Sequence, residues 1–104
     1  QAVYAFQRAT FIKPDYSEGY YNMGNALKDQ GNLEQSVVAY KKAISFKSDY
    51  PAAFYNMGTA FKNLDKLEDA VKAFKKAIML KPDYVEAHNN LGTCFRNKVV
   101  TKRL

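Results

Sequence analysis

The chain has 104 residues, of which 47% are hydrophobic and 14% aromatic, so it can form one domain with a packed core. It contains no apolar run long enough to cross a bilayer and no visible secretory signal, and its single cysteine excludes an internal disulfide framework and fits a reducing compartment, which favours the cytoplasm. The net charge of +6 keeps acidic partners, including nucleic acid, among the possibilities.

The sequence repeats with a period of 34 residues. An Asp-Tyr pair begins at positions 15, 49 and 83, and 17 of the 34 positions are identical between 15–48 and 49–82. Such a period is typical of one supersecondary unit stacked on copies of itself. We therefore predict a single array over 1–104, divided into 1–14 (second helix of a partial repeat), 15–48 and 49–82 (full repeats), 83–97 (first helix of a partial repeat) and 98–104 (a tail that departs from the pattern).

Each period divides into two helical halves. Apolar side chains and a glycine recur at i, i+3, i+4 and i+7, which is one stripe of an α-helix. In the first halves the stripe holds Tyr20, Met23, Gly24 and Leu27, then Phe54, Met57, Gly58 and Phe61, then His88, Leu91, Gly92 and Phe95. The second halves carry a similar stripe from Leu33 and from Leu67, and the segment 1–14 matches them through Ala2, Phe6, Ala9 and Pro14.

The expected helix ends follow from local residue types. Asp15, Asp49 and Asp83 are interpreted as N-caps, and two of them stand three residues before a glutamate, as in a capping box. Pro51 fits the first turn of its helix, where a missing N–H costs little. Gly31 fits the position after a helix, where a left-handed backbone is needed.

The glycines at positions 24, 58 and 92 fall inside helices, where glycine costs about 1 kcal/mol relative to alanine. A cost that recurs needs a recurring reason, and we expect the paired helix to approach closely there. Tyr40 and Phe74 would then fill the space between the paired helices.

These residues together resemble the tetratricopeptide repeat. The family pattern is an aromatic residue, Leu-Gly, an aromatic, Ala, an aromatic, Ala and Pro. Here it reads Phe54, Met57-Gly58, Phe61, Ala70, Phe74, Ala77 and Pro82. The departures are the missing Trp, Met for Leu, and Ser48 in place of Pro. The resemblance implies an all-α, right-handed superhelical solenoid of antiparallel helix pairs, with about six helices.

The last part of the chain leaves the pattern after Asn97. Val99 stands where Gly31 stood, so the last helix is expected to run on past residue 98. We interpret the chain as a fragment of a longer array or a processed product. The end helices should expose apolar faces, and a first helix at one end with a second helix at the other predicts head-to-tail self-association.

The resemblance also implies that first helices line an inner, concave surface. The side chains opposite the core stripe are the candidate ligand residues: Tyr21, Asn22, Asn25, Lys28, Tyr55, Asn56, Thr59, Lys62, Asn89, Asn90, Thr93 and Arg96. Within this set, asparagines 22, 56 and 90 form one ladder, which offers donors and acceptors to a peptide backbone. A similar ladder marks the repeat domain of O-linked N-acetylglucosamine transferases. Lys28, Lys62 and Arg96 form a second, positively charged ladder.

The two ladders predict a non-catalytic scaffold that binds an extended protein or peptide ligand of acidic character. The alternative at these residues is that the asparagines make only local hydrogen bonds and the lysines are solvated. Chaperone-docking members of the family hold a terminal carboxylate with two asparagines and three basic residues. Asn25 and Asn56 match the asparagines, but Tyr21, Glu86 and Asn90 replace the basic residues, so carboxylate capture should be weak.

Other function classes remain as alternatives or are disfavoured. The chain could be the substrate-docking part of a larger enzyme such as a glycosyltransferase. Basic pairs at 41–42 and 75–76, with Arg8 in the matching place, permit nucleic-acid binding, but no base-reading code accompanies them. His88 is interpreted as a packing residue and Cys94 as a small buried one. Six residues apart on one helix, they cannot form a nucleophile pair, and we expect no metal, cofactor or catalysis.

Overall fold

The structure, a computed structural model, describes the backbone of residues 16–103 and the side chains of residues 16–99. These residues form five α-helices and no strand: α2 (Tyr16–Asp29), α3 (Leu33–Phe46), α4 (Pro51–Asn63), α5 (Leu67–Leu80) and α6 (Val85–Arg103). The predicted helix in 1–14, the cap at Asp15 and the basic Arg8 lie outside the described residues. In the described part, no helix is both long and apolar enough to cross a membrane.

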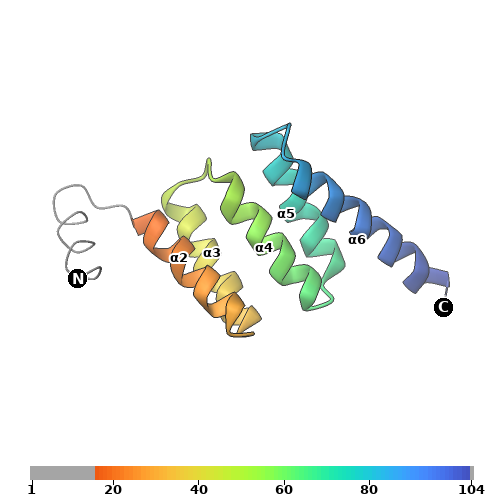
Figure 1. The fold of residues 1–104 in the computed structure, drawn as a ribbon, viewed down its shortest axis with the longest axis horizontal. Coiled ribbons are helices and arrows are strands. Elements are labelled where there is room, and N and C mark those ends of the chain that lie inside the picture. Colours follow the sequence, from red (N-terminus) through yellow and green to blue (C-terminus); the bar gives the residue numbers. More distant parts are fainter. Residues whose placement is uncertain (1–15, 104) are drawn as a thin grey trace.

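The helices form antiparallel pairs along the array, α2 with α3 and α4 with α5, and α6 follows (Figure 1). Each helix packs against its neighbours in sequence, and α2 also contacts α4, as α4 contacts α6. The first helices of successive repeats therefore adjoin one another directly. The fold is the all-α array of helix pairs that the period predicts.

The core lies between the paired helices. Tyr40 and Phe74 are fully buried, together with Ala43 and Ala77. A Cβ added at Gly24 would lie 2.7 Å from the Tyr40 ring, and one added at Gly58 would lie 2.7 Å from the Phe74 ring. The expected reason for the two glycines is confirmed, because the ring of the second helix occupies the space that any side chain would need.

The turn after each first helix has a common hydrogen-bond pattern. After α2, the Gly31 N–H donates to the Lys28 carbonyl and the Asn32 N–H donates to the Leu27 carbonyl, with Gly31 at φ 85°. This is a Schellman motif, with glycine in the left-handed position. The same two bonds follow α4, where Asp65 holds that position at φ 62°.

The third copy of this position is Val99, and there α6 does not turn but continues to Arg103. A β-branched residue with a positive φ is a strong steric outlier, whereas a helical φ suits it. The expectation that the last helix runs past residue 98 is confirmed.

Two expectations about the helix starts are wrong. Helix α4 begins at Pro51 with Tyr50 as its N-cap, and α6 begins at Val85, so Asp49 and Asp83 each lie one residue before the cap. The carbonyls of Tyr50 and Tyr84 accept the first intrahelical bonds, from Phe54 and His88. Pro51 does occupy the first position of its helix, as predicted.

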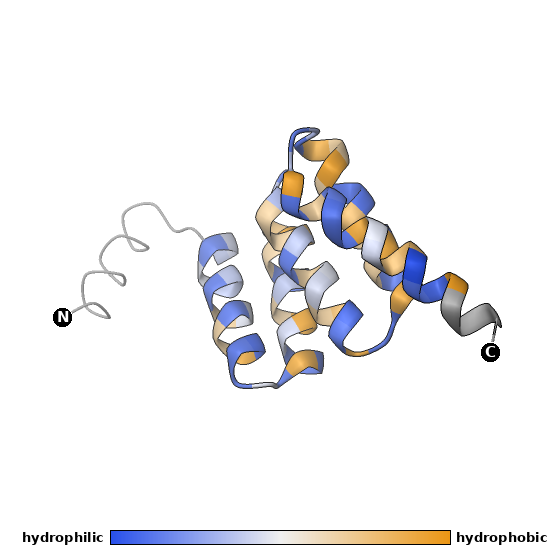
Figure 2. Ribbon diagram, turned by 45° about the vertical axis from the view of Figure 1, so that its right-hand side comes forward, coloured by the Kyte–Doolittle hydropathy of each residue, from blue (hydrophilic) through white to orange (hydrophobic). Residues whose placement is uncertain are grey.

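Hydropathy is uneven along the array. In Figure 2, α2 and much of α6 are drawn in hydrophilic colours, while the helices between them carry more of the hydrophobic colour. Helix α2 buries only Ser17 and Gly24, whereas α4 buries five residues, including Met57 and Phe61. The interior helix of the array thus contributes more to the core than the first described helix does.

Candidate functional site

The candidate ligand residues lie on the first helices of the repeats, α2, α4 and α6, and several of them meet across the junction between repeats. Asn56 on α4 donates from Nδ2 to the Tyr21 hydroxyl on α2, at 2.9 Å. The Lys28 ammonium donates to Asn56 Oδ1 at 3.1 Å and to Thr59 Oγ1 at 3.0 Å. These side chains are half-buried. They form what we call the first bridge: Tyr21, Lys28, Asn56 and Thr59.

The same arrangement recurs 34 residues later, between α4 and α6. Asn90 donates from Nδ2 to the Tyr55 hydroxyl at 3.0 Å, and Lys62 donates to Asn90 Oδ1 at 2.6 Å. We call this the second bridge: Tyr55, Lys62 and Asn90. Two bridges with the same atoms in the same roles show that the sequence period extends to the polar side chains.

The bridges use part of the hydrogen-bonding capacity of each asparagine. A side-chain amide has two N–H donors and two acceptor positions on its oxygen. Asn56 keeps one donor and one acceptor position beyond its bonds to Tyr21 and Lys28. Asn90 also donates to the Glu86 carbonyl at 3.1 Å, so one acceptor position is left. The same asparagine side chain can therefore make local hydrogen bonds and still have groups left to bond a peptide backbone, although the sequence presents these two roles as alternatives.

The two bridge lysines are held by neutral acceptors. Among residues 16–99, no carboxylate lies within ion-pair distance of either ammonium. Burial lowers the pKa of Lys28, and the nearby Asp29 charge opposes this shift. A half-buried ammonium without an ion-pair partner attracts an anion more strongly than a solvated one, because less water screens it.

The tyrosine rings of this face belong to the packing between repeats. The Tyr21 ring lies 6.0 Å from that of Tyr40 and 5.0 Å from that of Tyr50. Tyr55 lies 5.8 Å from Phe74 and 5.0 Å from Tyr84 in the same geometry. These rings are therefore already packed in tilted contacts with other rings of the protein, which leaves less of their surface for nucleic-acid bases.

Asn25 has a role in the core. Its Oδ1 accepts a hydrogen bond from the Tyr40 hydroxyl, and burial raises the pKa of that phenol. In the next repeat, Phe74 has no hydroxyl and Thr59 replaces the asparagine. Thr59 instead donates to the Asn56 carbonyl at 2.7 Å and accepts from Lys28. The asparagine is thus present in the repeat whose buried ring has a hydroxyl to donate, and threonine replaces it in the repeat whose buried ring has none.

The remaining candidates lie at the two ends of the described face. Asn22 is exposed on α2. On α6, Thr93 donates to the Asn89 carbonyl at 3.1 Å, and Arg96 donates to Thr93 at 3.1 Å. Arg96 is exposed. Of the three residues in the positive ladder, Lys28 and Lys62 therefore belong to the bridges, whereas Arg96 is solvated.

Two residues that were considered for chemistry have other roles. His88 is exposed, contrary to the packing role expected for it, and its Nε2 lies 2.8 Å from the Pro82 carbonyl. Because a carbonyl only accepts, that nitrogen carries the proton. Cys94 is fully buried, as expected, and burial raises the pKa of its thiol. Over the described residues, no group of three potential metal ligands comes together.

The lysines of the second helices contact aromatic rings of the next repeat. The Lys41 ammonium lies 6.0 Å from the centre of the Phe61 ring, and Lys75 lies 5.8 Å from that of Phe95. Part of the basic surface proposed for nucleic acid therefore lies over apolar rings, where its charge also stabilises the fold.

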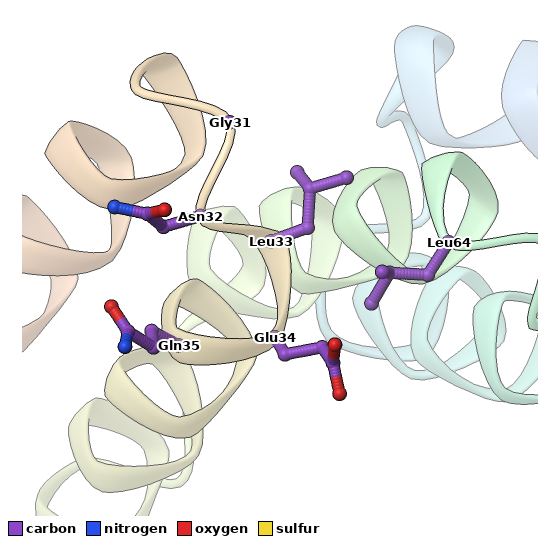
Figure 3. A pocket seen from close by; sticks show the side chains of 6 residues that line it. All are labelled: Gly31, Asn32, Leu33, Glu34, Gln35 and Leu64. Atoms are coloured by element: carbon purple, nitrogen blue, oxygen red, sulfur yellow. The ribbon is translucent and has the colours of Figure 1, made fainter.

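A shallow depression of about 290 Å³ lies at the turn between α2 and α3, and no bridge residue lines it. Leu33 and Leu64 line it from two different repeats (Figure 3). The sequence does not predict this depression, because its walls come from turns whose separation the period does not specify. The other residues that line it are Gly31, Asn32, Glu34 and Gln35.

Antiparallel helix pairs with an aromatic ring against a glycine in each pair define the molecule as a helical repeat protein. Two family models match it: one described as TPR repeat over residues 24–65, and one described as tetratricopeptide repeat over residues 51–84. The chain belongs to the tetratricopeptide repeat (TPR) family. No curated protein sequence matches it significantly.

Solved structures with similar folds include two TPR domains of Spaghetti (RPAP3), each bound to the HSP90 peptide SRMEEVD. The second domain superposes with a TM-score of 0.77 at 23% identity, covering 83% of this chain and 79% of that one. The first gives 0.80 at 21% identity, covering 94% and 78%. The crystal structure of MamA gives 0.80 at 23% identity, covering 93% of this chain and 57% of that one. At these identities the similarity establishes the fold.

Proposed function

We propose that this chain is a non-catalytic protein-interaction module that binds an extended, acidic peptide along the face formed by α2, α4 and α6. The observation that carries the proposal is the pair of bridge lysines. Lys28 and Lys62 are held in the same register on consecutive first helices, and neither ammonium has a carboxylate partner among the described residues. A peptide carboxylate would supply the missing charge in a charge-assisted hydrogen bond.

The spacing of the lysines favours a particular peptide pattern. Helices in contact lie about 8–10 Å apart, and α2 contacts α4 directly. A polyproline II peptide rises about 3.1 Å per residue with three residues per turn, so positions i and i+3 lie on one side and about 9 Å apart. Two acidic side chains with this spacing would meet Lys28 and Lys62 together.

The asparagines support the same mode of binding. The unused donor and acceptor of Asn56 and the unused acceptor of Asn90 can pair with peptide N–H and C=O groups whatever the side chains. Two TPR domains of similar fold bind a peptide that contains adjacent glutamates. In this chain the basic positions of the carboxylate-binding members are Tyr21, Glu86 and Asn90, so internal acidic side chains, and not the peptide terminus, are the proposed anchor.

The test measures fluorescence anisotropy with labelled proline-rich peptides that carry glutamates at i and i+3. The expected result is binding that weakens with salt, is lost when both glutamates become glutamine, and is unchanged when the peptide carboxy-terminus is amidated. Lys28→Met or Lys62→Met should each weaken binding about tenfold, as expected for the loss of one hydrogen bond to a charged group.

The matched control is Lys72→Met, which makes the same change at an exposed lysine on α5. It should leave peptide affinity unchanged apart from a small effect of net charge. Binding that is equally weakened by all three substitutions would mean that only the overall charge of +6 matters, and would overturn the proposed site. A strong dependence on a free peptide terminus would overturn the proposed anchor.

A further inference from the structure

Helix α6 carries an open socket, which we define as the surface around Gly92, Phe95 and Val99. In α4 the corresponding surface is closed, because the Phe74 ring of α5 lies against Gly58 and Phe61 is only 8% exposed. In α6 a Cβ added at Gly92 would meet only the far end of Arg96, at 3.6 Å. Phe95 is 44% exposed and Val99 50%. The pattern of a first helix is therefore complete in α6, but its partner helix is missing from the described structure.

The chain does not reverse after α6 at the position where it reverses after α2 and α4. After α2 and α4 the chain reverses at Gly31 and Asp65, whereas at Val99 the helix continues to Arg103. No helix of the described residues fills the socket.

The required features of an occupant can be derived from the two occupied sockets. In α3 and α5 the buried positions form one pattern of small residues around a single aromatic: Ser36, Val37, Ala39, Tyr40 and Ala43 in α3, and Ala70, Val71, Ala73, Phe74 and Ala77 in α5. One other stretch of this sequence has the same pattern at the same spacing, namely Ala2, Val3, Ala5, Phe6 and Ala9. Each of these five residues is no larger than its counterpart in α3 or α5.

We propose that residues 2–9 of a second copy of this chain dock as a helix in the α6 socket, with Phe6 against Gly92. The contact joins two molecules, because residue 9 is only seven positions from the start of α2, while α3, α4 and α5 separate α2 from α6. A helical segment with so short a connection cannot reach across the array. The two surfaces differ, so the contact is head-to-tail and extends into chains of molecules.

The experiment measures molar mass by sedimentation and light scattering from micromolar to millimolar concentration. The unmodified chain should grow in mass continuously with concentration. Gly92→Leu should stay monomeric, because the leucine occupies the space for the Phe6 ring. Circular dichroism should show that this variant keeps its fold, since no rigid group lies near Gly92. Asn97→Leu adds the same side chain to an exposed position on α6 and should associate as the unmodified chain does.

Phe6→Ala should also remain monomeric, and a mixture supplies the decisive result. Gly92→Leu retains an intact segment 2–9, and Phe6→Ala retains an open socket, so the two variants together should form a one-to-one dimer that grows no further. The proposal would be overturned if the unmodified chain were monomeric at every concentration, or if the Gly92→Leu variant still associated. Either result would mean that residues 2–9 of a second copy do not occupy the socket. A discrete dimer of the unmodified chain would overturn it as well, because a head-to-tail contact does not close after two copies. None of these results bears on the peptide face, which lies at the bridges.

Discussion

Helices α4 and α6 have the same sequence pattern, but they are in different environments. Helix α4 packs between α3 and α5, whereas α6 packs against α5 on one side. Phe61 and Phe95 occupy equivalent positions, each with a lysine of the preceding helix over its ring, yet their exposed fractions are 8% and 44%. The difference shows how much burial the following helix supplies. A repeat of this kind gains its core from its neighbours, and identical residues contribute differently at the end of the array.

The largest effect should come from removing these two rings. Phe61→Ala should lower the free energy of unfolding by about 3–5 kcal/mol, which is the usual range for a buried aromatic. Phe95→Ala should cost less than half as much, because its ring is already half solvated and leaves a smaller cavity. Chemical denaturation followed by circular dichroism measures both values. Equal losses would show that the neighbouring helix does not determine the contribution of the ring.

The matched glycines should respond with opposite signs. Gly58→Ala places a Cβ 2.7 Å from the buried Phe74 ring, and overpacking of this kind costs about 1–3 kcal/mol. Gly92→Ala meets no such ring and should stabilise α6 by about 1 kcal/mol through helix propensity. Thermal unfolding should show a lower Tm for the first variant and a higher one for the second. A rise in both would contradict the close approach between α4 and α5.

A smaller effect on stability is expected from substitutions in the turns that follow α2 and α4. Asp65 adopts a left-handed backbone that Gly31 adopts without a steric cost. Asp65→Gly should therefore raise the free energy of unfolding by about 0.5–1 kcal/mol, and Gly31→Ala should lower it by a similar amount. The two variants can be compared in one series of thermal melts. A loss of stability in Asp65→Gly would indicate that the aspartate side chain contributes more than its backbone conformation costs.

The smallest effect concerns alkaline pH and the junction between α5 and α6. Burial, with smaller contributions from Tyr21 and Tyr55, raises the pKa of Tyr84 to about 12. The folded state thus favours the neutral phenol. Stability should be constant up to the ordinary tyrosine pKa of about 10 and should decrease as the pH rises from there to about 12. Melts between these pH values should show a shallower decrease for Tyr84→Phe. The control Tyr16→Phe changes a tyrosine that is 57% exposed, and it should leave the slope unchanged.

The sequence was sufficient to predict the fold and the core, because the relevant signals are local or recur with the period. The stripe of α4, the glycines at 24 and 58 and the buried Tyr40 and Phe74 follow from helix geometry and residue size. The same stripe fails at the two ends of the described array, where Met23 and Phe95 are 49% and 44% exposed and no ring of a paired helix lies against Gly92. The extension of α6 follows from the steric limits of Val99. The caps of α4 and α6 were placed one residue too early, since Asp49 and Asp83 are of a typical N-cap type but these two helices begin after the tyrosines that follow them.

The bridges could not be predicted in the same way. The sequence places Lys28 and Asn56 in equivalent stripes, but it does not give the distance between α2 and α4 that brings the ammonium to the amide oxygen. A side chain as long as lysine could equally extend into solvent. His88 shows a similar limit, because its position in the stripe predicts packing, while the turn at Pro82 offers its ring a nearby carbonyl.

The proposed peptide binding at the bridges would be coupled to the shape of the array. The bonds from Lys28 cross from one repeat to the next, so they help to set the angle at which successive repeats meet. Under the proposed function, an anion that drew this ammonium away from Asn56 and Thr59 would change that angle, and the same change at Lys62 would add to it. The pitch of a longer superhelix would then differ between its free and peptide-bound states. The end-to-end length of such an array would therefore depend on how many of its binding positions are occupied.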